Sequence, residues 1–62
     1  MVGRPWTLEG LLAARVLAAA NAPLAHIGEA LDRLSGEVDR ALWMLVGRTP
    51  EQALALLNRG FA

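Results

Sequence analysis

Cysteine and lysine are both absent from this chain of 62 residues. Without cysteine no disulfide can stabilise the fold, and nothing in the sequence indicates an oxidising compartment. Without lysine, six arginines balance six aspartates and glutamates, so the formal net charge is zero. A neutral chain has no overall electrostatic attraction to nucleic acid or anionic lipid. We therefore expect a cytoplasmic protein, and the charge balance disfavours strong autonomous DNA binding.

Long apolar runs are absent as well. The longest uncharged stretch, residues 16–25, contains Asn21 and Pro23, and it is too short to span a bilayer. Near the N-terminus, Arg4 is followed by proline and tryptophan rather than by the apolar run and small-residue cleavage site of a signal peptide. We expect a soluble protein with no membrane contact.

The residues that catalysis and metal binding require are scarce. His26 is the only histidine, and a single imidazole with the nearby carboxylates of Glu29 and Asp32 makes a poor metal site. Ser35 and Thr49 precede helical patterns and are better explained as helix N-caps than as nucleophiles. A glycine-rich phosphate loop is also missing. We expect no catalytic, metal or cofactor site and no enzymatic activity.

Apolar side chains, in contrast, are abundant and make up 55% of the sequence. A domain of this length hides only about 60% of the surface that its unfolded chain exposes. Part of the apolar surface is therefore expected to meet a partner or a second copy. We predict a single domain over residues 1–62 that forms a homo-oligomer.

Capping signals and apolar periodicity predict four helices, over residues 7–21, 23–34, 35–46 and 49–59. Thr7 is the expected N-cap of the first helix, with Trp6 placed to pack on Leu11 as a hydrophobic staple. This helix is rich in alanine and leucine and is apolar around most of its circumference. We expect it to be the most buried element.

The next two helices follow in close succession. The second is amphipathic, and its charged side includes the i,i+4 pair Glu29–Arg33. Ser35 is the expected N-cap of the third helix. Residues 41–46 of that helix form an unbroken apolar run, which no amphipathic helix can bury on one side.

The fourth helix has the clearest start signal. Gly47 occupies a C-cap position, and Thr49, Pro50 and Gln52 supply an N-cap, a first-turn proline and a capping box. The expected buried side of this helix consists of Ala53, Leu54, Leu57 and Phe61.

The second and third helices together have the pattern of a helix-turn-helix. Such a motif needs small or apolar inner residues so that its helices can cross closely. Residues of this kind stand at Ile27, Gly28, Leu31, Val38 and Ala41. The turn is predicted at Asp32 to Leu34, where glycine is the more usual first residue. The predicted fold is all-α, a three-helix helix-turn-helix core with a fourth, C-terminal helix.

Residues 5–46 resemble the Myb/SANT-like and GcrA-like helix-turn-helix domains of bacteria and their phages. Trp6-Thr7-x-Glu9 is similar to their W-T-x-E opening. The segments Ile27-Gly28-Glu29-Ala30-Leu31-Asp32-Arg33 and Ser35-Gly36-Glu37-Val38 are similar to their I-A-x-x-L-G-R-S-x-x-A-V core. The resemblance implies that the third helix is a recognition helix and that the protein acts in transcription.

The leading hypothesis is therefore a small regulator that associates with double-stranded DNA. The candidate DNA contacts are Arg4, Arg33, Ser35, Arg40 and Arg48. For the arginines, the alternative is a purely solubilising role. The third helix departs from the family pattern because Glu37 and Asp39 stand near its start, and carboxylates repel phosphates.

The alternative hypothesis is a helical protein-interaction or homo-oligomerisation module that does not bind DNA. Its partner would be a second copy or another regulatory protein. The candidate interface residues are Trp43, Met44 and Val46. For Trp43 and Met44, the other interpretation is packing into the core against the fourth helix.

Overall fold

A computed structural model describes residues 4–59 of the chain. It contains four helices: α1 (Leu8–Ala19), α2 (Leu24–Leu31), α3 (Ser35–Met44) and α4 (Pro50–Leu57). No strand occurs in this part of the chain. The all-α prediction with a fourth, C-terminal helix is confirmed, although each helix is shorter than predicted.

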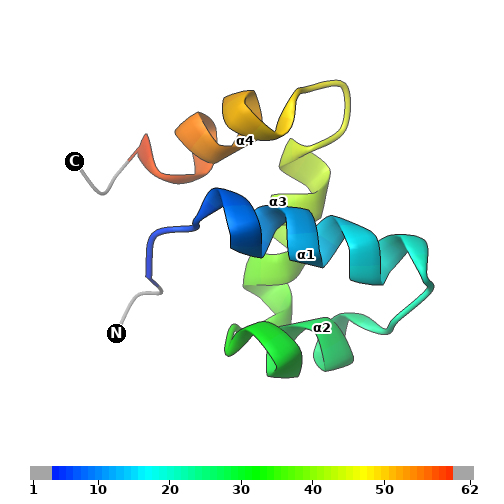
Figure 1. Cartoon of the computed structure of the whole chain (residues 1–62). Helices are drawn as coiled ribbons and strands as arrows, with labels where there is room; N and C mark the ends of the chain where they lie inside the picture. Colours follow the sequence, from blue (N-terminus) through cyan, green and yellow to red (C-terminus); the bar gives the residue numbers. More distant parts are fainter. Residues whose placement is uncertain (1–3, 60–62) are drawn as a thin grey trace.

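The helices are arranged around a crossing of α1 and α3. In Figure 1, α1 passes in front of α3, with α2 below and α4 above. Both α1 and α3 pack against each of the other three helices. The first helix, which the sequence predicts to be the most buried element, therefore shares the central position with α3.

The core is made from large side chains and alanines. Its buried members are Trp6, Leu11, Ala14, Ile27, Val38, Ala41, Ala53 and Leu57. Alanines on three of the four helices let the backbones approach closely, and leucine, isoleucine and valine fill the remaining space. The buried side chains of α4 belong to this same core, as predicted, whereas the predicted core residue Phe61 lies outside the described residues.

The helix ends explain why α1 and α2 are short. Asn21 and Asp32, with φ of 66° and 57°, adopt the left-handed conformation just beyond these helices. The N–H of Arg33 donates to the Gly28 carbonyl at 2.7 Å, and that of Asp32 donates to Glu29 at 3.3 Å. This is the hydrogen-bond pattern of a Schellman motif. The turn lies where it was predicted, with an aspartate in the position that favours glycine.

The N-caps confirm two predictions and correct a third. Thr7 accepts a hydrogen bond from the Gly10 N–H at 3.0 Å, and Thr49 and Gln52 form the predicted capping box. The prediction of Ser35 as the N-cap of α3 is wrong, because Ser35 is already the first helical residue. The N-cap is Leu34. Its N–H donates a hydrogen bond to Oε1 of Glu37, three residues later, at 3.0 Å.

None of the helices in residues 4–59 is long and apolar enough to cross a bilayer.

Candidate functional site

The candidate site is the outward side of α3, whose residues are exposed and do not belong to the core. Val38 and Ala41 are fully buried on the inner side of this helix. We call the opposite side the outer stripe of α3, and it consists of Gly36, Asp39, Arg40 and Trp43, all exposed. Their spacing of i, i+3, i+4 and i+7 places them on one face of the helix.

Trp43 is the most unusual member of the outer stripe. Trp43 is 69% exposed, and Val46, just beyond the helix, is 63% exposed. A shallow hollow of about 190 Å³ lies beside them and is lined by Asp39, Leu42, Trp43 and Val46. An exposed tryptophan next to exposed valine forms a compact apolar patch, which is a common feature of interaction sites.

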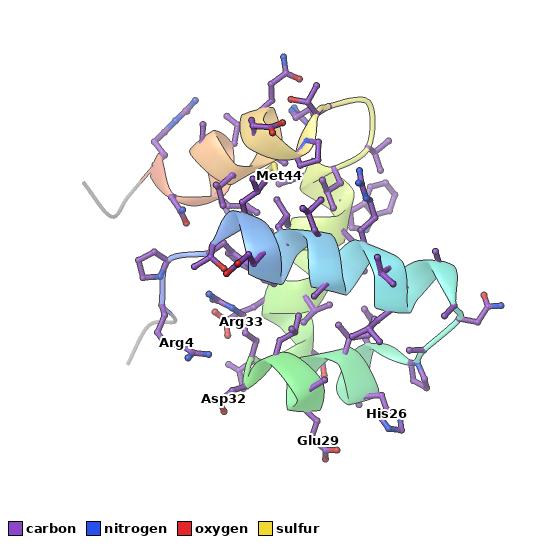
Figure 2. All side chains as sticks on the ribbon, in the orientation of Figure 1. Arg4, His26, Glu29, Asp32, Arg33 and Met44 are labelled. Atoms are coloured by element: carbon purple, nitrogen blue, oxygen red, sulfur yellow. The ribbon has the colours of Figure 1, made fainter. Side chains whose placement is uncertain are left out.

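Met44 has a different environment from its neighbour. It is half-buried and packs against the core, and Figure 2 shows it on the upper part of α3, beside α4. For Met44 the core interpretation is therefore correct. For Trp43 the core interpretation is wrong, because successive residues of a helix point about 100° apart and only one of the two can face α4.

Arg33, in the turn between α2 and α3, binds the N-terminal segment. Its guanidinium donates to the carbonyls of Arg4 and Pro5, at 2.7 Å each, and pairs with Glu37 at 3.3 Å. The same group lies over the Trp6 ring, 4.1 Å from its centroid. Only 7% of the Arg33 side chain is exposed. This geometry makes Arg33 a structural residue with little surface to present to DNA.

The predicted Glu29–Arg33 pair is wrong for a backbone reason. Helix α2 ends at Leu31, and the left-handed Asp32 turns the chain away from the helix axis. In Figure 2, Glu29 points away from the lower side of α2, whereas Arg33 extends toward the N-terminal segment. Arg33 therefore pairs with Glu37 instead.

Two other candidate arginines cap helix ends. Arg4 donates to the carbonyls of Leu31 and Asp32, at 3.3 and 2.5 Å, and lies 3.7 Å from the Asp32 carboxylate. Arg48 donates to the Met44 carbonyl at 3.3 Å. Cations in these positions interact favourably with the negative ends of helix dipoles. Among the candidate DNA contacts, Arg40 lies on the outer stripe, and Ser35 lies exposed at the start of α3.

The turn itself borders an open groove with acidic walls. The groove has a volume of about 550 Å³ and is lined by Ala25, Gly28, Glu29, Asp32, Arg33, Leu34, Ser35 and Glu37. Three of these residues are carboxylates, and the single arginine is the buried Arg33. Such a lining repels phosphate groups. Ser35 therefore stands at a surface that is poorly suited to a nucleic acid backbone.

His26 lies apart from any constellation that could bind a metal. It is exposed on the outer side of α2, where Figure 2 shows it pointing away from the other helices. Within residues 4–59, histidine, aspartate and glutamate form no group of three or more that could hold a metal ion.

Sequence reasoning missed the contact that joins the two ends of the described chain. The Trp6 N–H donates to Asn58 Oδ1, and Asn58 Nδ2 donates to the Trp6 carbonyl, each at 2.8 Å. The two residues are 52 positions apart, so no local pattern could indicate the pair.

No protein-family model matches this chain, and neither does any curated protein or solved structure. The resemblance to helix-turn-helix domains consequently rests on the motifs in the sequence.

Proposed function

We propose that this chain is a protein-interaction module, built on a helix-turn-helix scaffold, that binds another protein through the outer stripe of α3. The observation that carries the proposal is the 69% exposure of Trp43 in that stripe. Tryptophan is enriched among the residues that contribute most to protein–protein affinity, because it buries a large rigid surface. In a DNA-reading motif this face would carry groups that contact phosphates and base edges.

The arrangement of charge also favours a protein partner over DNA. Arg33 is buried, and Arg4 and Arg48 cap helix ends. Arg40 lies next to Asp39 on the outer stripe, so that face carries no net positive charge. Affinity for DNA depends mainly on neutralising several phosphates, which this surface is poorly equipped to do.

DNA association in transcription remains a second candidate, favoured by the tight turn between α2 and α3 and by the exposed Arg40. A regulatory role is compatible with both candidates, because an interaction module can act by binding another regulator.

A fluorescence-anisotropy titration against random double-stranded DNA at low salt distinguishes them. Non-specific DNA binders have dissociation constants on the order of 10⁻⁴ to 10⁻⁶ M even at physiological salt. We expect no rise in anisotropy across that range. A salt-dependent rise that Arg40→Ala weakens and Trp43→Ser leaves intact would favour DNA association instead.

A further inference from the structure

We propose that the partner of the outer stripe of α3 is a second copy of this chain, and that the two α3 helices pack side by side in parallel. This inference rests on the proposed function, since it uses the same surface. It names the partner and fixes the relative direction of the two helices.

The first step is the position of each residue around the helix. Each residue advances by about 100°, so Gly36 and Trp43 lie within about 20° of each other and define the midline of the stripe. Relative to Trp43, Asp39 lies about 40° to one side and Arg40 about 60° to the other. Both charged side chains are exposed. The stripe therefore has an acidic flank, an apolar centre and a basic flank.

The second step is symmetry. A two-fold interface uses the same surface on both subunits, so this surface must be complementary to itself. With parallel helices related by a two-fold axis along their length, the acidic flank of each copy meets the basic flank of the other. Asp39 then faces Arg40 of the second copy, twice, and the two Trp43 side chains meet at the centre.

The antiparallel arrangement has the opposite consequence. Its two-fold axis runs across the helices and brings equal flanks together. In the register that packs Trp43 on Gly36 of the second copy, Asp39 faces Asp39 and Arg40 faces Arg40. In the register that brings the two Trp43 side chains together, these equal charges lie about 9–12 Å apart along the helices and no Asp39–Arg40 pair forms. Like charges in contact oppose association and suppress the wrong register. The charges at the edge contribute little affinity by themselves, but they select the parallel direction, while Trp43 and Val46 supply the apolar contact.

A second copy also suits the charge of the stripe better than a strongly charged partner does. One carboxylate and one guanidinium on opposite flanks are both matched by an identical surface turned about the two-fold axis. The apolar residues exposed on this side, at 69% for Trp43 and 63% for Val46, are matched in the same way.

Sedimentation equilibrium over a range of concentrations tests the inference. We expect the wild type to dimerise and Trp43→Glu to abolish the dimer. Asp39→Arg and Arg40→Asp should each raise the dimer dissociation constant by about tenfold or more, because each creates two like-charge contacts. The double variant Asp39→Arg/Arg40→Asp should restore dimerisation, and an equimolar mixture of the two single variants should form a heterodimer.

Val16→Glu is the matched control, because Val16 is 66% exposed on α1 rather than on α3, and it should leave the dimer intact. Far-UV circular dichroism of each variant at low concentration checks that the fold is retained. A wild type that stays monomeric would overturn the inference, and so would a dimer that Asp39→Arg does not weaken. If Asp39→Arg leaves the dimer intact but Trp43→Glu abolishes it, the parallel arrangement is wrong and the proposed function is still supported. A dimer disrupted by Val16→Glu but not by Trp43→Glu would overturn both.

Discussion

At the scale of single residues, Arg33 joins the N-terminal segment to the first turn of α3 through its contacts with Arg4, Pro5 and Glu37. Its spacing from Glu29 predicts a surface ion pair, yet the guanidinium is buried against Trp6 and bound to two backbone carbonyls. Those carbonyls belong to Arg4 and Pro5, 28 or 29 positions earlier in the chain. Sequence patterns record neighbours on one helix, and this role depends on contacts that only the folded chain creates.

Replacing Arg33 should therefore destabilise the fold. Arg33→Ala removes a stacked cation and leaves the half-buried Glu37 carboxylate without its cationic partner, for which we expect a loss of about 1.5–3 kcal/mol in the free energy of unfolding. Arg33→Lys should recover little, because an ammonium cannot reproduce the planar fork of donors. Urea denaturation measures both variants.

Arg15→Ala is the control for that measurement. Its side chain is exposed on α1, away from the outer stripe of α3, and surface substitutions of this kind usually change stability by less than about 0.5 kcal/mol. Equal stability of Arg33→Lys and the wild type would show that the forked hydrogen bonds contribute nothing.

At the scale of elements, the helices and their order were predictable, whereas their ends were only partly so. Thr7, Thr49 and Gln52 act as expected because a cap is a local interaction. The predicted first helix includes Asn21, since nothing in the apolar periodicity reveals a left-handed residue, and the predicted range of the second helix overlaps the turn that is correctly predicted at Asp32. The exposure of Trp43 in the outer stripe was predictable in part, because one side of a helix cannot bury all of the apolar residues 41–46 and some of them must face outward.

Two glycines in helices should respond in opposite ways to alanine. A Cβ on Gly28 would lie 2.5 Å from the Arg33 carbonyl oxygen, whereas a Cβ on Gly36 would meet nothing within 4 Å. Gly28→Ala must push the turn away from α2, and we expect a loss of at least about 2 kcal/mol. Gly36→Ala should gain about 0.5–1 kcal/mol through helix propensity.

Thermal melts followed by circular dichroism at low concentration test the pair. Similar midpoints for Gly28→Ala and Gly36→Ala would mean that the close approach of the turn to α2 is not required.

At the scale of the whole molecule, α4 decides whether the domain is a three-helix unit with an appendage or a four-helix unit. It packs on both α1 and α3 and contributes Ala53 and Leu57 to the core. Asn58, just after it, holds the backbone of Trp6 through two hydrogen bonds. Since Trp6 also lies under Arg33, the end of α4, the N-terminal segment and the helix-turn-helix are linked through one tryptophan.

Removing everything after Gly47 should consequently destroy cooperative folding. Burial of an apolar side chain such as Leu57 stabilises a domain by roughly 1.5–3 kcal/mol, and the whole stability of a small domain is only about 5–15 kcal/mol. The truncated chain would also lose both hydrogen bonds of Asn58 and expose the inner sides of α1 and α3. We expect residues 1–47 to show no cooperative thermal transition, or to aggregate. If α4 were instead a mobile arm that binds a partner, the truncated and full-length chains would melt within a few degrees of each other. Because 1 kcal/mol shifts the midpoint of so small a domain by about 4–8 °C, a circular-dichroism melt of the two chains side by side separates these outcomes.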